Sequence, residues 1–419
     1  MHVADLIVLH AAELLTLAGD PAGPRVGPAL AEVGLVTDGA VAAADGQIVA
    51  AGPTPEVLDL VRPARRARRI DATGRAVLPG FVDPHTHLIF AGDRTDEFER
   101  RLRGASYQEI AAAGGGILST VAATRAADEE TLVRLGWGRL DRMLACGTTT
   151  AEAKSGYGLT VDDELKQLRA VHRLSARHDV DLVATLLAAH AVPPEFAAAP
   201  DAYVALITDD LLPLVADEDL AEFCDAFCDV GAFTVEQSRA VLEAGDDLGL
   251  RPKLHADEFA DVGGARLAAE LEAISADHLL RASDDGLRAM AAAGVIGVLL
   301  PGTAFFLGLP YADARRIIEQ GVPVALATDF NPGTSPTWSM PAVIALACAG
   351  MKLTPAEAIA AATINAAWAI GLADEVGSLE PGKAADLVIL DAPDHRALAM
   401  HFGAPLVRTV VKRGRVVVG

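Results

Sequence analysis

The sequence predicts an α/β fold: a (β/α)8 TIM barrel with a small β-sandwich domain that both chain ends build together. Two observations support this fold. Between residues 76 and 375, eight short apolar runs recur, and each is followed by a longer stretch rich in Ala, Leu, Glu and Arg. Both chain ends instead alternate short apolar runs with turn residues, and neither end has enough of these runs for a sheet of its own.

The terminal strands are expected to be short. Apolar runs such as "DLIVLH" and "GQIVAAG" are separated by dipeptides that are typical of turns: Asp38-Gly39, Asp45-Gly46, Gly52-Pro53, Pro381-Gly382 and Arg413-Gly414. We therefore expect residues 1–75 and 376–419 to form one composite domain, and residues 76–375 to form the barrel.

The expected barrel strands are short apolar runs that end in small or polar residues. In chain order, the strand ends are "GFVDPHTH", "GTTTAEAKSGYG", "DLVATLLAAH", "CDAFCDVGAF", "RPKLHADEF", "AISADHLL", "GVIGVLLPGT" and "VPVALATDF". The intervening helical stretches are long enough for the crossovers that parallel strands require.

Composition limits the classes of function. The 419 residues are 51% hydrophobic and 22% charged, which is enough apolar material for a large core. The chain has 35 basic and 57 acidic residues, a formal charge of −22, and such a surface repels nucleic acid and anionic membranes. Four cysteines do not make a disulfide framework, so a reducing, cytoplasmic setting is expected.

One uncharged segment is long enough to span a bilayer. No charged residue lies between Ala289 and Ala312, but Pro301-Gly302 interrupts the segment at its centre. We expect a buried strand followed by a loop there. The N-terminal "MHVADLIVLHAAELL" lacks a basic leader, so neither a signal peptide nor a membrane span is expected.

Two histidines end the first barrel strand, in "FVDPHTHLIF". His85 and His87 are two residues apart, so they point to the same face of the strand. They lie at the carboxyl end of the strand, where barrel enzymes carry their chemistry. Two converging imidazoles provide half of a metal site, although the pattern is weak by itself.

Polar residues end four other strands as well. His190 ends the third strand, His255 the fifth, His278 the sixth and Asp329 the eighth. Because the carboxyl ends of all eight strands meet at one mouth of a barrel, these side chains are expected to gather there. The sequence therefore predicts a metal site.

The ligands follow from the chemistry of these side chains. His85, His87, His255 and Asp329 supply three nitrogens and one carboxylate, a set that suits Zn²⁺ or Fe²⁺. A remaining position would hold water, and the cation would lower the pKa of that water and supply a hydroxide nucleophile.

Three side chains are candidates for proton transfer. His278 and Asp329 would flank the water and take its proton. Glu258, three residues after His255, either delivers a proton to a ring nitrogen of the substrate or is a surface carboxylate.

Other signatures are absent or undecided. The sequence has no G-x-S-x-G, Walker or dinucleotide-binding motif. Cys224 and Cys228 have no second Cys/His pair beside them, so no metal site is expected there. Gly114-Gly115-Gly116 is either a loop that bends over the site or a flexible connector.

The motifs "PGFVDPHTH", "KLHADE", "SADHL" and "ATDFNPG" resemble the amidohydrolase superfamily. "HTHLIFAGDRTDEFERRLRGASYQEIAAAGGGILSTV" and "AKSGYGL" resemble its imidazolonepropionase family, and the likeness covers essentially the whole chain. The resemblance implies a homodimer that opens the cyclic amide 4-imidazolone-5-propanoate to N-formimino-L-glutamate in histidine degradation, with a metal-bound hydroxide attacking the ring carbonyl. It implies one divalent or trivalent metal ion, Zn or Fe, because strand four ("DAFCDVG") lacks a bridging lysine and Lys154 follows strand two.

The resemblance also implies which residues meet the substrate: Arg94, Tyr107, Tyr157, His190, Glu258, Asn331, Gly333 and Thr334. Arg94 would pair with the propanoate in bidentate fashion, and a protonated His190 would stabilise the oxyanion. Glu258 would lie beneath the ring, and the loop around Asn331 would offer backbone and side-chain donors. Two residues have ordinary alternatives, since Arg94 could form a surface ion pair with its acidic neighbours and Tyr157 could be a loop aromatic.

Two other functions fit parts of the pattern. A guanine or cytosine deaminase would share the metal ligands, but a neutral nucleobase does not require Arg94 and Tyr157 together. A non-catalytic metal-binding scaffold would normally have lost ligands, and every expected ligand is present.

Overall fold

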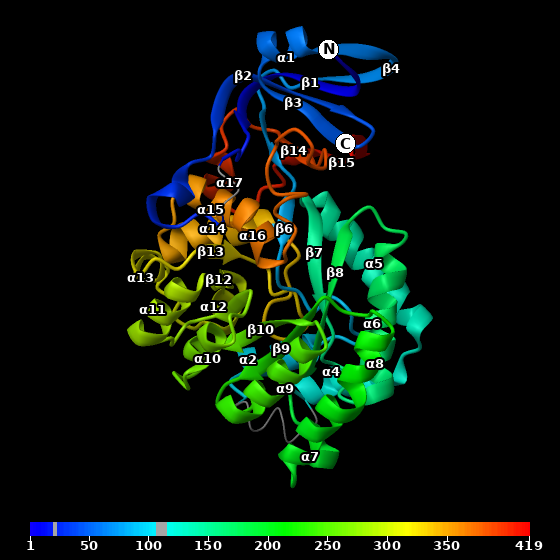
Figure 1. The fold of residues 1–419 in the computed structure, drawn as a ribbon, viewed down its shortest axis with the longest axis vertical. Coiled ribbons are helices and arrows are strands. Elements are labelled where there is room, and N and C mark those ends of the chain that lie inside the picture. The colour runs from blue at the N-terminus through cyan, green and yellow to red at the C-terminus, as the bar shows by residue number, and fades with distance from the viewer. Residues whose placement is uncertain (20–22, 106–114) are drawn as a thin grey trace.

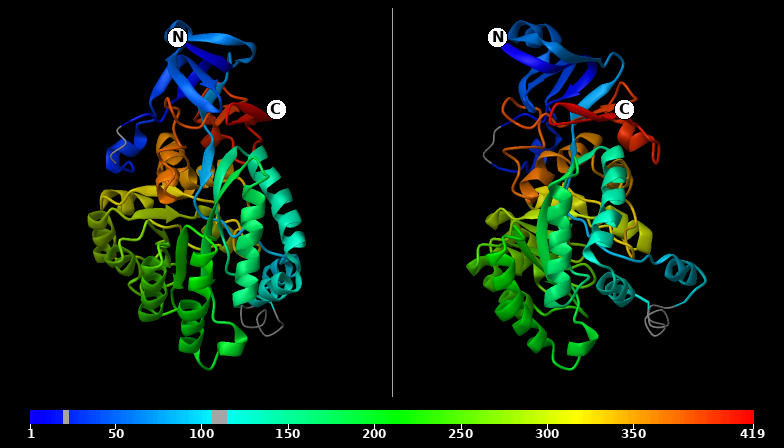
Figure 2. Two further views of the ribbon diagram at one scale, coloured as in Figure 1. Left: turned by 45° about the vertical axis from the view of Figure 1, so that its right-hand side comes forward. Right: turned by 90° about the vertical axis from the view of Figure 1, so that its right-hand side faces the viewer.

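A computed structural model describes residues 1–19, 23–105 and 115–419. Its strands form two sheets of eight strands each. One sheet is the barrel, and the other contains both chain ends at one end of the molecule (Figure 1, Figure 2).

The barrel strands are the eight that the sequence predicts. Every neighbouring pair is parallel, and the strands follow one another in chain order. They are β6 (Phe81–Asp83), β7 (Thr148–Lys154), β8 (Asp181–Ala189), β9 (Phe223–Cys228), β10 (Arg251–Ala256), β11 (Ser275–His278), β12 (Ile296–Leu299) and β13 (Val324–Leu326). The (β/α)8 prediction is confirmed.

Helices connect the barrel strands, and most of them pack around the outside of the barrel (Figure 1). They are α2 (Thr95–Leu102), α4 (Ile117–Ala126), α5 (Glu129–Ala145), α6 (Val161–Ser175), α7 (Pro200–Ala205), α8 (Leu212–Asp217), α9 (Val235–Asp247), α10 (Gly264–Glu270), α11 (Asp284–Ala293), α12 (Pro301–Leu307), α13 (Ala314–Glu319), α14 (Met340–Met351), α15 (Pro355–Ala361) and α16 (Ile364–Ala369). In the described ranges, no helix is long and apolar enough to cross a membrane.

Contacts between the first and last strands close the barrel. Thr86 and Phe330 form a parallel bridge just beyond the ends of β6 and β13. Beside it, the Asp329 backbone N–H donates to the His85 carbonyl at 3.0 Å, and the His87 N–H donates to the Phe330 carbonyl at 2.9 Å. These bonds fix the relative heights of the residues around the barrel mouth.

The terminal sheet combines strands from both chain ends, as expected. Its order is β16-β15-β14-β5-β1-β2-β3, and β4 also pairs with β1. The strands are β1 (His2–Leu15), β2 (Leu35–Ala44), β3 (Gln47–Pro53), β4 (Val61–Asp71), β5 (Ala76–Pro79), β14 (Leu387–Leu390), β15 (Val407–Lys412) and β16 (Arg415–Val418). Since β5 belongs to this sheet, the sheet extends beyond the predicted boundary at residue 75. Two short helices, α1 (Thr54–Leu60) and α17 (Ala397–Met400), accompany it.

Two local predictions were wrong. Asp38-Gly39 is no turn, because β2 runs through it and keeps pairing with β1. Asp38 has a φ of 48°, but Thr37 and Gly39 on either side of it keep one register with Glu13 and Ala11 of β1. The register shifts instead between Val8 and Ala11 of β1, where His10 has a φ of 60°. The segment after β12 is not a loop either, since Pro301 at the first helical turn begins α12.

A buried ion pair joins the terminal sheet to the barrel, and it yields the first prediction. The Lys412 ammonium in β15 lies 2.5 Å from Asp386 and 2.8 Å from Asp181, the first residue of β8. Lys412→Ala leaves the buried Asp386 carboxylate without a counter-charge, so the free energy of unfolding should fall by roughly 3–5 kcal/mol.

Urea denaturation of both proteins measures this difference. Arg415→Ala is the matched control, because Arg415 pairs with Asp179 on the surface and its loss should change the free energy by less than about 1 kcal/mol. Equal effects of the two substitutions would show that the buried pair does not fasten the sheet to the barrel.

Candidate active site

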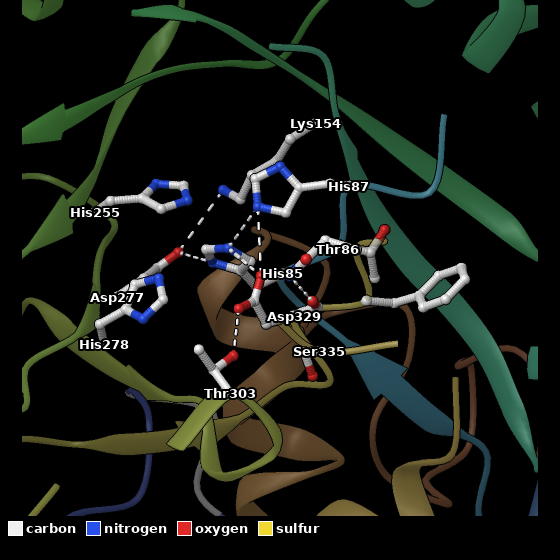
Figure 3. A network of polar contacts seen from close by, with 12 residues as sticks. His85, Thr86, His87, Lys154, His255, Asp277, His278, Thr303, Asp329 and Ser335 are labelled. Carbon is white, nitrogen blue, oxygen red and sulfur yellow. Dashed lines mark hydrogen bonds and ion pairs between the residues drawn. The ribbon is translucent and has the colours of Figure 1, made fainter. Parts of the chain in front are cut away.

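The polar residues predicted at the strand ends converge at the barrel mouth (Figure 3). The Nε2 atoms of His85 and His87 lie 3.2 Å apart. Asp329 Oδ1 lies 3.5 Å from the first of these nitrogens and 3.4 Å from the second. These three residues come from the two strands that close the barrel, and their ligand atoms are close enough to hold one metal ion.

Two further imidazoles complete the cluster. His255 ends β10, and its ring centroid lies 4.5 Å from that of His85. His278 ends β11, and its ring centroid lies 5.3 Å from that of His255. His85, His255 and His278 form a second group whose ligand atoms are close enough for a metal.

Buried carboxylates fix two of the rings. His85 Nδ1 lies 2.6 Å from Asp277 Oδ2, and His255 Nδ1 lies 3.0 Å from Asp225 Oδ2. A carboxylate draws the imidazole proton to Nδ1 and leaves the Nε2 lone pair free. Metal-ligating histidines in proteins are commonly oriented in this way.

The residues present fit a metal ion. Burial lowers the pKa of His85 and His87 well below the ordinary value, and it lowers the pKa of His278 to about 3, so the rings are neutral and offer lone pairs. Among the described residues, His87 Nδ1, His278 Nδ1 and His255 Nε2 have no hydrogen-bond partner. Neutral imidazoles with unpartnered nitrogens beside a carboxylate suit a cation of zinc or iron type.

The chain adopts unusual backbone conformations to present two of these side chains. His278 has a φ of 77° and Asp329 a φ of 51°, in the left-handed region that β-strand residues avoid. Both residues come at the point where a strand ends. Such backbone strain is often found at functional sites.

A cavity of about 530 Å³ opens beside the cluster. Its walls include most of the predicted site residues, both metal ligands and residues expected to act on substrate: His87, Arg94, Tyr157, His190, His255, Glu258, His278, Asp329, Asn331 and Thr334. Phe227 and Phe259 add an apolar wall. The predicted Tyr107 and the first glycine of the Gly114-Gly116 triplet lie outside the described residues.

Arg94 faces this cavity, but it does not pair with Asp93 or Asp96. Its Nε donates to Glu97 Oε2 at 2.9 Å, and its Nη2 donates to Glu97 Oε1. The backbone N–H of Gly116 donates to Glu97 Oε2 at 2.8 Å. A side-chain carbon at Gly333 would lie 2.0 Å from Arg94 Nη1, so glycine leaves room for the guanidinium.

The loop after β13 differs from what the resemblance implies. The N–H groups of Gly333 and Thr334 donate to the Asn331 side-chain oxygen at 2.9 and 2.7 Å, and the Thr334 hydroxyl donates to the same oxygen at 3.0 Å. The Asn331 amide donates to the Asp329 carbonyl at 2.7 Å. The donors expected to meet the substrate therefore already hold the loop together.

The surroundings of His190 in this structure disfavour the protonated ring that the resemblance implies. Burial beside His87 and His255 lowers its pKa well below the ordinary value. Its Nδ1 donates to the Gly156 carbonyl at 3.0 Å, so Nε2 is an acceptor. A neutral His190 can receive a hydrogen bond from a ring N–H rather than donate one to an oxyanion.

Glu258 and Tyr157 are both buried, and burial favours the uncharged form of each side chain. Burial and the nearby carboxylates of Asp329 and Asp229 raise the pKa of Glu258 well above its ordinary value. Burial also raises the pKa of Tyr157, so it remains a phenol. Glu258 lies 3.6 Å from His278 Nδ1 and is not a surface carboxylate.

Sequence reasoning missed a layer of buried charges beside the cluster: Glu152, Lys154, Asp225, Lys253 and Asp277. Lys154 is the last residue of β7. The sequence had suggested instead that Lys154 comes after this strand. The sequence did contain a signal for this layer. Ionisable residues lie two apart inside apolar strands, as in Glu152/Lys154 and Lys253/His255. Charged side chains in a buried strand imply partners across the barrel.

Residues 68–102 and 102–418 match the model of the amidohydrolase family. A protein named imidazolonepropionase from Symbiobacterium thermophilum is 55% identical over 420 residues, which are 100% of this chain and 98% of that protein. Proteins of the same name from Geobacillus kaustophilus (55% identical, 99% of this chain and 98% of that protein) and Parabacteroides distasonis (48% identical, 99% of each) also match.

Solved structures share the fold at low sequence identity. The crystal structure of an adenosine deaminase from Xanthomonas campestris with bound zinc has a TM-score of 0.73 at 21% identity, and the match covers 100% of this chain and 93% of that one. Guanine deaminase from E. coli has a TM-score of 0.71 at 16% identity, and the match covers 100% of this chain and 99% of that one.

The cluster predicts that metal stabilises the protein. Zn²⁺ at 100 times its dissociation constant should raise the free energy of unfolding by about 2.7 kcal/mol, because the folded state alone brings the ligands together. Urea denaturation of chelator-treated protein with and without added Zn²⁺ measures this gain. His87→Ala should lose most of it, whereas His395→Ala, in a separate group with Glu13 and Asp394, should retain it. Equal gains in both variants would place the metal elsewhere.

Proposed function

The chain belongs to the amidohydrolase family, and we propose that it hydrolyses 4-imidazolone-5-propanoate to N-formimino-L-glutamate in histidine degradation. Relatives named imidazolonepropionase that match the chain along its full length support this reaction. One structural observation carries the proposal. A single cavity holds both a guanidinium, which suits the propanoate, and the imidazole–carboxylate cluster, which suits a hydrolytic metal.

We propose that His85, His87, His255 and Asp329 hold one metal ion, zinc or iron, because three nitrogens and one oxygen suit either. When bound, such a cation lowers the pKa of a coordinated water toward neutrality and supplies the nucleophile for hydrolysis.

The side chains of the cavity divide the remaining tasks. Arg94 still has Nη1 free of its pairing with Glu97, and this N–H group is available to the propanoate. His190 Nε2 accepts a hydrogen bond from a ring N–H and orients the ring. Tyr157 lies 5.4 Å from the His190 ring, where it borders the substrate.

Hydrolysis of the ring amide needs two proton transfers. His278 and Asp329 take the proton from the attacking water, whose oxygen joins the ring carbonyl carbon. The carbon–nitrogen bond then breaks, and the protonated Glu258 carboxyl gives its proton to the leaving ring nitrogen. The products are a new carboxylate and the formimino group, which together make N-formimino-L-glutamate.

Three finer proposals complete this function. We propose that the protein is a homodimer, as the resemblance implies, and that it is cytoplasmic, as its cysteine content suggests. Its two proposed domains are residues 1–75 with 376–419, and residues 76–375. We assign β5 to the first domain because it pairs with β1 and β14 of the terminal sheet. The alternative, a nucleobase deaminase, shares the fold, but it leaves Arg94 without a role.

An ultraviolet assay of freshly prepared 4-imidazolone-5-propanoate tests the reaction. Metal-loaded protein should consume the compound and release N-formimino-L-glutamate, and prior treatment with a chelator should abolish consumption. Guanine and cytosine serve as control substrates. Turnover of a nucleobase, with none of the imidazolone, would replace the proposed substrate and keep the metal site.

Two substitutions separate chemistry from substrate binding. Asp329→Ala should abolish turnover, because it removes both a metal ligand and a proton acceptor. Arg94→Ala should chiefly raise KM, by roughly 10- to 100-fold, as expected for losing a charge-assisted hydrogen bond of about 1.5–3 kcal/mol.

Steady-state kinetics measure both effects. Arg103→Ala is the matched control, because Arg103 lies at the end of the same helix, is exposed and pairs only with Glu99 among the described residues. Activity that survives Asp329→Ala would overturn the mechanism, and an unchanged KM in Arg94→Ala would remove the proposed carboxylate contact.

A further inference from the structure

A single lysine lies between the two carboxylates that orient the metal ligands. The Lys154 ammonium is 2.7 Å from Asp225 Oδ2 and 3.7 Å from Asp277 Oδ2. The same two oxygen atoms face His255 Nδ1 at 3.0 Å and His85 Nδ1 at 2.6 Å. Lys154 thus contacts the carboxylates of both histidine–carboxylate pairs. Figure 3 shows one of them, with Asp277 between Lys154 and His85.

No solvent reaches these groups. The side chains of Lys154, Asp225 and Asp277 are fully buried, and Glu152, also buried, adds a third carboxylate 3.0 Å from the ammonium. Burial alone lowers the pKa of Lys154, but the carboxylates of Asp225, Glu152 and Asp277 outweigh it and raise the pKa above its ordinary value. The three carboxylates around the amine therefore favour its charged form.

We propose that Lys154 is the positioning residue of the metal centre. Its ammonium holds the Asp225 and Asp277 carboxylates in place, and through them it fixes His255 and His85 with Nδ1–H toward the carboxylate and Nε2 toward the metal. Without this cation, the buried carboxylates of Asp225 and Asp277 have no ammonium partner in contact and repel each other, which favours rotation or protonation of either carboxylate. Either response releases an imidazole from its orientation.

A second buried lysine, Lys253, makes it possible to separate the effect of the position of Lys154 from the effect of buried positive charge as such. Lys253 is equally buried, and its ammonium lies 3.0 Å from Glu152 and donates to the carbonyls of Pro84 and Ala369. Among the described residues, it makes no ion pair with Asp225 or Asp277. If only buried positive charge mattered, both lysines would serve the metal equally.

The proposal rests on the metal centre proposed above, but not on the identity of the substrate. Wild-type protein that binds neither Zn²⁺ nor Co²⁺ refutes the centre itself. Wild-type protein that binds metal, together with a Lys154 variant of equal affinity, refutes only the role of Lys154.

The experiment compares Lys154→Met with Lys253→Met. Zn²⁺ affinity is measured by competition with a chromophoric chelator, and the visible absorption of the Co²⁺ form reports the geometry of the ligands. Lys154→Met should weaken Zn²⁺ binding roughly 10- to 100-fold, as loss of an outer contact typically does, and should change the Co²⁺ spectrum. Lys253→Met should keep the wild-type spectrum and an affinity within about threefold.

A second variant with balanced charge is needed in case Lys154→Met alone does not fold. Glu152→Gln combined with Lys154→Met removes one charge of each sign, so the net charge of the layer stays the same and both histidine–aspartate pairs remain. This double variant should show the same loss of affinity. Wild-type affinity and spectrum in it, or an equal loss in Lys253→Met, would overturn the proposal.

A double-mutant cycle tests whether Lys154 acts through the carboxylate. If it does, Lys154→Met adds less to the loss of Zn²⁺ affinity when Asp277 is already Asn. The combined loss should then be smaller than the product of the two single losses. Losses that simply multiply would show that Lys154 influences the metal by another route.

Discussion

The seam between β6 and β13 is the constraint on which the site depends. The hydrogen bonds that close the barrel join the backbones of His85 and Asp329, and of His87 and Phe330. Three of the four proposed metal ligands thus belong to the seam. A shift of one residue in this pairing would turn their side chains to the opposite face. The barrel therefore brings the ligands together only when it closes in this register.

The second constraint on the site is that every charge buried behind the metal ligands needs a partner of opposite charge. Lone pairs of neutral imidazoles face one another at the mouth, and behind them carboxylates and ammonium groups pair without access to water. Each buried charge is tolerable only with a partner, so the layer is strongly interdependent. A layer of this kind holds ligands in place more firmly than surface contacts do, because any displacement leaves a charge unpaired.

The fold by itself does not decide the reaction. Solved structures of an adenosine deaminase and a guanine deaminase share it at 21% and 16% identity. The substrate has to be distinguished by the far wall of the cavity, where Arg94 is held by Glu97 and given space by Gly333. A guanidinium placed in this way favours a substrate with a carboxylate, which agrees with the relatives that match the whole chain.

The sequence by itself determined the barrel, the composite terminal sheet and the gathering of His85, His87, His255, His278 and Asp329 at one mouth. These follow from rules that act along the chain: side-chain alternation, strand length, and the shared polarity of parallel strands. Only the tertiary structure decided that Asp38-Gly39 lies within a strand, that Glu97 holds Arg94, and that Lys154 lies between Asp225 and Asp277. Such contacts depend on register and distance between residues remote in the chain, and no local pattern encodes them.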